Sequence, residues 1–551
     1  MKNLNFTFIL LGLFTNFLNA QKPEDIQLTT EFDKILSEQF KSNETGGAAL
    51  VAVNGQIIYK KAFGMADLEL NVPMQPDMIF RIGSITKQFT AVAVLQLMEQ
   101  GKLSLQDDIT KFLPDYPTNG YKITIEHLLT HTSGIQSYTG MKDFGEVMGK
   151  DMKPEEMINR FKNQPMEFAP GTKWNYDNSG YFLLGYIIEK ITGKTYPQYL
   201  EEVFFKPLGM THSYYGNDKK IIKNRASAYD KDDSIGFVNA QHLSMTLPYA
   251  AGSIQSTVED LFLWHQAVHS YKLVKKETIE KAFTSYKLTS GKDTHYGYGW
   301  FLGNVQGSPT IEHGGGINGF LTNGIYLPNE DVFVAVFSNC ECNSPNDVSS
   351  KMAALTIGKP YSYKEITLDN ATLQNYKGVY ENEAGDQRFI TWADNQLYSQ
   401  RSGNPKYKIH AFRKDNFFFE KTIATLEFIK TKTGQIEKIV AKGRPRDEIW
   451  NKTNKPLPIE TEITVNEKIL ESYIGDYEIA PGFILTITKE QNKLFEQATG
   501  QGKNELFPET ETKFFLKVVD AKITFFKEGS GKATHLILFQ GGQEMMGKKI
   551  K

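Results

Sequence analysis

The sequence predicts an α/β unit over roughly residues 25–358, followed by two small all-β barrels. Strand patterns at both ends of the first unit, at 47–63 and 298–338, flank a mainly helical middle. This order indicates one sheet that is built from both ends of the unit and covered by helices. The rest of the chain is strand-rich and contains an internal repeat, which predicts two domains of one fold.

Composition limits the classes of function. The 551 residues are too many for one hydrophobic core. A formal net charge of −2, without a long run of one sign, argues against nucleic acid or an anionic membrane as a partner. The two cysteines, Cys340 and Cys342, are too few for a metal cage, and their spacing favours two loop thiols over a bridge.

Residues 1–20 have the pattern of a signal peptide. Lys2 precedes a mostly apolar stretch, Phe6–Leu18, and Ala20 lies at a plausible cleavage point before a polar segment. This apolar stretch is shorter than a typical transmembrane helix. We therefore expect a periplasmic or secreted protein with no membrane span in its mature form.

Within the first unit, the dipeptide Asn54-Gly55 lies between two strand patterns and is typical of a tight hairpin turn. From Ile82 to Gly101 the chain is apolar on every face, which predicts a buried helix rather than a surface one. Strand character returns near the end of the unit, at 298–302, 319–327 and 331–338.

The repeat follows an offset of 97 residues, which separates Tyr376 from Tyr473 and Phe417 from Phe514. The matches continue without a gap through both copies, and each copy consists of short alternating segments. This pattern predicts two antiparallel barrels joined by a Pro-containing linker at 454–458.

The first motif with chemical potential is Ser84-Ile85-Thr86-Lys87, at the start of the predicted buried helix. On a helix, Ser84 and Lys87 share one face, and the helix start favours negative charge. Alone, the motif fits a capping serine and a solvated lysine equally well. The apolar helix beside Lys87 favours a functional role, because a buried ammonium needs polar partners.

Two further motifs lie in loop-like surroundings. Tyr176 and Asn178 follow a Pro-Gly turn, and His313 begins a run of three glycines that includes Gly315 and Gly316. Glycines there would let a substrate backbone approach closely. Taken separately, a packed turn tyrosine and a flexible turn with a surface histidine are the simpler interpretations.

In this order, the three motifs resemble those of the penicillin-recognising serine hydrolases, which include class C β-lactamases, DD-peptidases, related esterases and D-aminopeptidases. The resemblance covers nearly the whole first 360 residues and extends to Phe80–Lys87, Leu128–Gly134, Tyr249–Thr257 and Tyr296–Trp300. It implies an α/β (α+β) catalytic domain with an antiparallel sheet flanked by helices, in which 128–134 is structural.

The resemblance also implies an acyl-enzyme route with Ser84 as nucleophile and either Lys87 or Tyr176 as base; the sequence leaves the base open. A nearby Lys87 ammonium is expected to lower the pKa of Tyr176. Asn178 would bridge Lys87 and the substrate amide. Backbone N–H groups of Ser84 and Gly316 would form the oxyanion hole.

Substrate class is less constrained. His313 stands where β-lactamases of this group carry lysine, and histidine is typical of the esterase and peptidase branches. Two barrels after the catalytic domain are similar to the D-aminopeptidase arrangement, which favours peptides or amides that contain D-amino acids. An esterase with weak or no β-lactamase activity is the alternative. A non-catalytic binding protein is disfavoured by the intact motifs.

The expected domains are a signal peptide (1–20), a β-lactamase-like serine hydrolase domain (21–360) and two lipocalin-like barrels (361–458 and 459–551). The substrate is expected to be a small peptide, amide or ester. No clustered Cys/His pattern lies near the three motifs, so neither a metal nor another cofactor is expected.

Overall fold

The computed structural model describes residues 23–232, 235–393, 395–420, 422–443, 447–458, 462–480, 482–527, 529, 531–540 and 543–551. The predicted signal peptide lies outside the described residues. Within these ranges, no helix combines the length and apolarity that crossing a bilayer requires.

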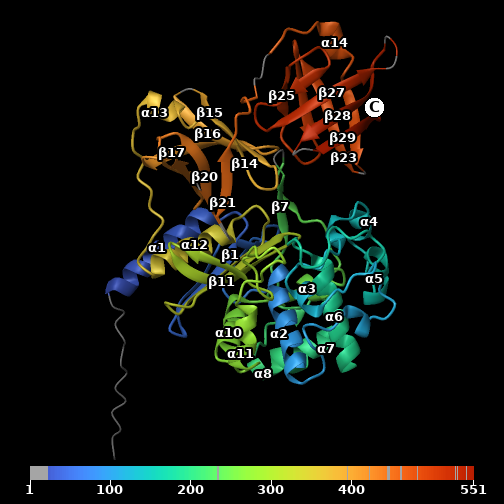
Figure 1. Cartoon of the computed structure of the whole chain (residues 1–551), viewed down its shortest axis with the longest axis vertical. Coiled ribbons are helices and arrows are strands. Elements are labelled where there is room, and N and C mark those ends of the chain that lie inside the picture. Colours follow the sequence, from blue (N-terminus) through green and yellow to red (C-terminus); the bar gives the residue numbers. More distant parts are fainter. Residues whose placement is uncertain are drawn as a thin grey trace, which may run out of the picture.

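A six-stranded antiparallel sheet forms the centre of the first unit (Figure 1). Its first and last segments meet where Gly47 pairs with Ser338 and Val53 with Val332. The prediction that both ends of the unit contribute to one sheet is therefore confirmed. The strand order is β10 (Phe301–Val305), β11 (Ser308–Ile317), β12 (Phe320–Leu327), β13 (Val332–Ser338), β1 (Gly47–Val53) and β2 (Gln56–Phe63).

Both faces of this sheet are covered by helices (Figure 1). Leu50 and Ala335 point into the large core beneath the helical layer, whereas Val51 and Val334 point into a second core on the opposite face. Because the central strands are buried on both faces, they are continuously apolar rather than alternating.

The second core is covered by α1 (Pro23–Gln39) and α12 (Pro345–Thr356). The helical layer on the other face consists of α2 (Thr86–Glu99), α3 (Ile125–Leu129), α4 (Phe144–Val147), α5 (Pro154–Phe161), α6 (Asn178–Thr192), α7 (Tyr196–Leu200), α8 (Lys206–Leu208), α9 (Tyr249–Gly252), α10 (Val258–His269) and α11 (Lys276–Ala282). Short strands join this layer: β3 (Met65–Asp67), β4 (Val72–Pro73), β5 (Phe80–Arg81), β6 (Tyr214–Tyr215), β7 (Tyr229–Asp232), β8 (Gly236–Asn239) and β9 (Ile254–Ser256).

Local sequence explains two of the predicted elements. Asn54 and Gly55 have φ values of 50° and 72°, as a two-residue hairpin turn between β1 and β2 requires. Helix α2 is buried on nearly every face, as its apolar pattern predicts, and Gly101 follows it with φ 68°.

The remaining chain forms two closed eight-stranded barrels. The first contains β14 (Gly378–Glu381), β15 (Gln387–Ala393), β16 (Gln396–Arg401), β17 (Lys406–Arg413), β18 (Asn416–Phe419), β19 (Thr425–Lys430), β20 (Ile436–Lys442) and β21 (Glu448–Lys452), preceded by α13 (Asn370–Gln374). The second contains β22 (Gly475–Ala480), β23 (Phe483–Glu490), β24 (Lys493–Ala498), β25 (Asn504–Pro508), β26 (Lys513–Phe515), β27 (Ala521–Lys527), β28 (Ala533–Gln540) and β29 (Gln543–Lys549), preceded by α14 (Glu467–Glu471).

The repeat offset relates the two barrels strand by strand, and β24 begins 97 residues after β16. A buried hydrogen bond recurs as well. The Tyr380 hydroxyl donates to the Tyr376 carbonyl at 2.7 Å, and Tyr477 donates to Tyr473 at the same distance. The predicted pair of barrels is confirmed.

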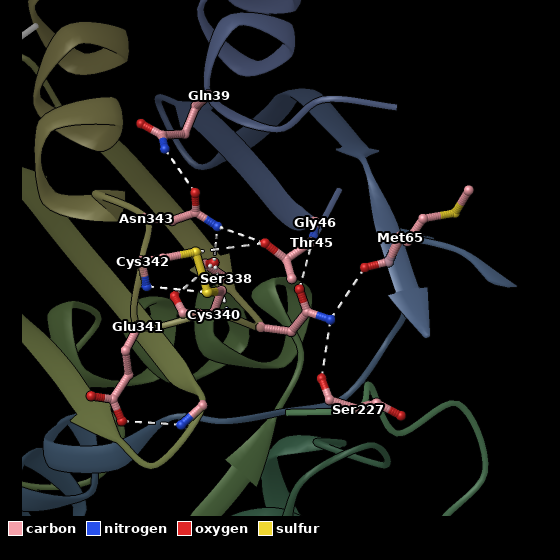
Figure 2. The surroundings of a disulfide bond; sticks show 12 residues. Gln39, Thr45, Gly46, Met65, Ser227, Ser338, Cys340, Glu341, Cys342 and Asn343 are labelled. Atoms are coloured by element: carbon pink, nitrogen blue, oxygen red, sulfur yellow. Dashed lines mark hydrogen bonds between the residues drawn. A yellow bond between two sulfur atoms is a disulfide. The ribbon is translucent and has the colours of Figure 1, made fainter. Parts of the chain in front are cut away.

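Cys340 and Cys342 form a disulfide directly after β13 (Figure 2). The expectation of two loop thiols was wrong, because the turn after β13 brings the two Cα atoms to 5.1 Å, within bonding range. The neighbouring Asn343 amide donates to Ser338 Oγ at 2.9 Å and to Thr45 Oγ1 at 3.4 Å, which fixes this turn against the start of β1.

Candidate active site

Ser84 lies in a 3₁₀ turn, η1 (Gly83–Ile85), that leads directly into α2. Gly83 has φ 51°, and a Cβ atom there would lie 3.0 Å from the Gly316 nitrogen. A glycine is therefore required for the backbone to turn so close to β11. Thr86, the first residue of α2, is held in place because its hydroxyl accepts a hydrogen bond from the Ile254 backbone N–H at 3.0 Å.

Lys87 is fully buried one turn after Ser84. Its ammonium Nζ donates to Ser84 Oγ at 3.1 Å, to Asn178 Oδ1 at 2.8 Å and to the Ala251 carbonyl at 2.9 Å. All three acceptors are uncharged. They solvate the ammonium without supplying a counter-charge.

The pKa of Lys87 is lowered to about 7, chiefly by burial, while the Asp177 charge acts in the opposite direction. A lysine with this pKa exists in part as the neutral amine at neutral pH. The structure thus gives Lys87 the property of a base beside a serine hydroxyl.

Tyr176 and Asn178 are positioned by the start of α6. Asp177 caps this helix, since its carboxylate accepts from the backbone of Ser179 at 2.7 Å and of Gly180 at 3.0 Å. Tyr176 precedes the capping residue, and the centre of its ring lies 4.7 Å from Lys87 Nζ. Asn178 follows the capping residue and is the first residue of α6.

Burial raises the pKa of the Tyr176 hydroxyl, with Ser84 weakly opposing. The expectation that the Lys87 ammonium would lower this pKa was wrong, because desolvation of the phenolate dominates and the Asp177 charge acts in the same direction. Tyr176 therefore stays protonated near neutral pH and can act there as a proton donor.

His313 lies in β11, so the run of glycines that follows it is strand rather than flexible turn. Its Nδ1 donates to the Gly314 carbonyl at 2.6 Å, which leaves Nε2 to accept from the Tyr296 hydroxyl at 3.1 Å. Burial, reinforced by Lys87, lowers the pKa of His313 to about 3. The imidazole is neutral under ordinary conditions.

The glycines differ in the space around them. A Cβ atom on Gly315 would lie 2.0 Å from the Ile82 carbonyl oxygen and 2.4 Å from Thr322 Oγ1. One on Gly316 would meet only Leu321, at 3.3 Å, and Gly316 is exposed. Gly315 is required for β11 to pack against the residue before η1, whereas Gly316 faces open space.

A cavity of about 380 Å³ opens over this cluster and is lined by Ser84, Tyr176 and His313, together with Phe301, Glu312, Gly314, Asn323 and Asn346. Lys87 lies behind Ser84. The seven candidate residues thus lie in η1, α2, β11 and at the start of α6, and Ser84, Tyr176 and His313 share one cavity. Among the described residues, no group of three or more His, Cys, Asp or Glu side chains is arranged to hold a metal ion.

Sequence reasoning missed several contributors. The Ala251 carbonyl and the Tyr296 hydroxyl belong to segments that resemble the family, but no sequence pattern indicates which of their atoms contacts the site. Glu312 lines the cavity without having been singled out. His131, interpreted as structural, accepts from the Asp177 backbone at 3.0 Å, and its ring lies 4.3 Å from Tyr176.

An antiparallel sheet with a serine and a buried lysine at the start of a central helix defines a serine hydrolase of the β-lactamase fold. The chain belongs to the Beta-lactamase family, whose model matches residues 32–358. A second model, described as a domain of unknown function (DUF3471), matches residues 460–549.

Relatives agree with this assignment. A penicillin-binding protein of Bacillus subtilis (strain 168) is 27% identical over 417 residues, which cover 70% of this chain and 91% of the relative. The structure of the octameric penicillin-binding protein homologue from Pyrococcus abyssi is 28% identical, with a TM-score of 0.54, and covers 77% of this chain and 99% of its own. A D-stereospecific amidohydrolase from Streptomyces sp. is 25% identical, with a TM-score of 0.53, and covers 60% and 99%.

Proposed function

We propose that this chain is an exported serine hydrolase that forms an acyl-enzyme at Ser84 and cleaves peptides or amides containing D-amino acids. The observation that carries the proposal is the 3.1 Å hydrogen bond between Ser84 Oγ and a buried Lys87 whose other partners are uncharged. A serine hydroxyl needs a base in hydrogen-bond reach before it attacks a carbonyl, and neutral Lys87 is such a base.

In the acylation step, Lys87 Nζ accepts the Ser84 proton while Oγ bonds to the substrate carbonyl carbon. The carbonyl oxygen becomes an oxyanion, which the backbone N–H groups of Ser84 and Gly316 would stabilise. The proximity of Gly83 to the Gly316 nitrogen supports this pairing.

Collapse of the intermediate breaks the bond from the carbonyl carbon to the leaving amine. Tyr176 donates its proton to that amine and is reprotonated from the Lys87 ammonium, so that both groups return to their starting states. Water then attacks the acyl-enzyme, loses its proton through the same pair, and Ser84 leaves with a proton. The raised pKa of Tyr176 supports its role as donor.

Because His313 is neutral, it cannot form an ion pair with a substrate carboxylate. This favours amide or ester substrates that have no carboxylate next to His313. A cationic lysine there could pair with such a carboxylate, but an imidazole with a pKa of about 3 supplies no charge. The likeness to a D-stereospecific amidohydrolase agrees with this preference. An esterase using the same residues is the alternative.

Export is supported by the disulfide between Cys340 and Cys342, because disulfides persist mainly in oxidising compartments. The signal-peptide pattern at residues 1–20 leads to the same proposal from the sequence.

The experiment that tests the proposal measures kcat/KM of the purified protein for D- and L-aminoacyl amides, short-chain esters and a chromogenic cephalosporin. We expect the D-amides to be the best substrates and the cephalosporin the poorest. Equal values for D- and L-amides, with higher values for esters, would replace the peptidase proposal by the esterase alternative.

A further inference from the structure

The first barrel contains an open cavity of about 730 Å³ that the proposed hydrolase chemistry does not use. It lies at one end of the barrel, where β16, β18 and β20 end and β17, β19 and β21 begin. Cavities of this size hold small organic molecules, and the mouth of a closed barrel is a common place for them.

Arg388 on β15 lines this cavity and is only 8% exposed. One guanidinium nitrogen donates to Ser399 Oγ at 2.9 Å, and the group lies 4.6 Å from the centre of the Trp450 ring. Its Nε is buried and has no hydrogen-bond partner among the described residues. A buried guanidinium with an unused donor is unfavourable, so an unmet requirement for an acceptor exists here.

The carboxylates that line the cavity lie against other partners. Glu448 pairs with Arg401 at 3.7 Å, and Glu420 pairs with the ring of His410 at 3.0 Å. In the part of the chain that the structure describes, no carboxylate forms an ion pair with Arg388. Glu448 acts on the Arg388 charge from a distance but pairs with Arg401, so the Arg388 guanidinium has no carboxylate in direct contact among the described residues.

A second arginine, Arg401, lies beside Arg388 and carries its own ion pairs, with Asp386 at 3.3 Å and Glu448 at 3.7 Å. Arg401 lies directly across from Arg388 in the β15–β16 pair, and its guanidinium is 5.1 Å from the same Trp450 ring. Like charges opposite each other destabilise a sheet. The pKa of Arg388 is accordingly lowered to about 10, by burial first and by Arg401 second, while Glu448 acts in the opposite direction. Three lysines also line the cavity, Lys406, Lys408 and Lys442, of which Lys442 pairs with Glu427 at 2.8 Å.

The second barrel shows that the fold does not need these charges. At the repeat offset, Leu485 replaces Arg388 and Ala498 replaces Arg401, and these two pair across the same strands. Both belong to the apolar core of that barrel. Two arginines in the first barrel thus occupy positions that apolar residues fill in its twin, at a cost that binding a ligand would offset.

We propose that the mouth of the first barrel binds a small amphipathic carboxylate, with its anionic head on Arg388 and its apolar part against Phe419, Leu426 and Ala441. The guanidinium offers parallel N–H donors, which match the geometry of a carboxylate. The apolar side chains line the same cavity and belong to or pack on the barrel core. This site is separate from Ser84 and independent of the hydrolase proposal.

The test uses the full-length protein and octanoate as the probe, with octan-1-ol and octylammonium as neutral and cationic controls, measured by titration calorimetry. We expect saturable octanoate binding with a Kd on the order of 1 mM or tighter. Arg388→Leu introduces the residue that the second barrel already carries, and should weaken octanoate binding at least about tenfold. Exposed Arg413 does not line the cavity, so Arg413→Leu removes the same charge and should leave binding unchanged.

Equal octanoate affinity in the wild type and in Arg388→Leu would overturn the proposal, as would octanol binding as well as octanoate. Absence of octanoate binding by the wild type would overturn it too. Ala441→Trp fills the cavity while keeping both arginines, and carries the test if Arg388→Leu does not fold. It should abolish octanoate binding; unchanged binding would place octanoate elsewhere. Labelling of Ser84 should be unaffected in every variant.

Discussion

At the scale of single residues, Lys87 differs from an ordinary lysine in the charge of its partners. A serine hydroxyl, an amide oxygen and a backbone carbonyl hold its ammonium, and none of them carries a negative charge. Desolvation therefore dominates and lowers its pKa to about 7. Tyr176, which loses solvent in the same cavity, shifts in the direction that keeps it protonated.

This difference predicts the pH dependence of acylation. Below pH 7 Lys87 is an ammonium that cannot accept the Ser84 proton, and above pH 7 it is mostly the free amine. We expect kcat/KM to rise with pH through an apparent pKa of about 7. Asp177→Asn keeps a helix-capping side chain but removes the charge that raises the Lys87 pKa. Burial raises the pKa of Asp177 itself to about 7, so its charge is only partly present where Lys87 titrates, and the rising limb should move to lower pH by less than about one unit.

If the rise of kcat/KM moved to higher pH in Asp177→Asn, the titrating group would not be Lys87. The control is Lys87→Arg, whose guanidinium does not deprotonate. In this variant the limb should vanish and the rate should fall by about 10²–10⁴-fold. A surviving limb near pH 7 would contradict the assignment of the base to Lys87.

At the scale of elements, the site depends on how closely β11 approaches η1. A Cβ on Gly315 would lie 2.0 Å from the carbonyl oxygen of Ile82, whereas one on Gly316 meets only the end of the Leu321 side chain. Of these two adjacent glycines, only Gly315 lies where a side chain would clash with the backbone. Gly315 is needed for β11 to pack against the residue before η1, whereas Gly316 has room for a side chain.

Gly315→Ala and Gly316→Ala form a matched pair. We expect Gly315→Ala to lower the free energy of unfolding by about 1–3 kcal/mol, because the backbone of Ile82 must move, and to reduce activity more than tenfold. Gly316→Ala should change the midpoint of thermal unfolding little and retain most activity. Thermal denaturation and kcat/KM of the two variants, measured together, check this. Similar losses in both would mean that the glycines serve flexibility rather than close packing.

The success of sequence reasoning also varied by element. The Asn54-Gly55 hairpin and the helix after Ser84 follow from local pattern, and both were predicted. The strand at His313 was not, because glycines have low strand propensity and its pairing partner and the contact with Ile82 come from distant parts of the chain. The Cys340–Cys342 disulfide was also not predicted, because it depends on the turn after β13.

For the candidate site, residue types and order could be predicted, but protonation could not. The pKa of Tyr176 depends on how completely the fold removes water, which a motif does not contain. Asp177, the cap that orients Tyr176 and Asn178, lay inside a recognised motif without being given a role. The signal peptide, the domain boundaries and the roles of the seven candidate residues stay predictions.

At the scale of the whole molecule, the two cores of the catalytic unit are complete without the barrels. Their buried residues run from Phe32 to Ala354, with Tyr361 packed at the edge. Each barrel has a core of its own. An ion pair between Lys292 and Glu383 connects the catalytic unit to the first barrel, and both side chains are largely exposed, so it adds little stability.

A truncated chain ending at residue 361 should therefore fold and retain labelling at Ser84. We expect its preference to shift towards simple esters, because barrels beside a cleft can restrict which substrates enter. The measurement is the ratio of kcat/KM for a free-amine D-amide and an ester in both chains. Equal ratios would mean that the barrels do not gate the site, and would remove the support that the domain order gives to a D-aminopeptidase-like function.

Whether Ser84 is the nucleophile can be measured by covalent labelling of the full-length protein with an active-site-directed phosphonate, followed by intact-mass and peptide mass spectrometry between pH 5 and 9. Ser84→Ala is the matched variant, since it removes one oxygen at a half-buried position and leaves Lys87 with its two other partners. We predict one adduct, on the peptide that contains Ser84, formed at a rate that rises through about pH 7 and absent in Ser84→Ala. Labelling of Ser84→Ala at the wild-type rate would contradict the central claim that Ser84, activated by Lys87, is the nucleophile.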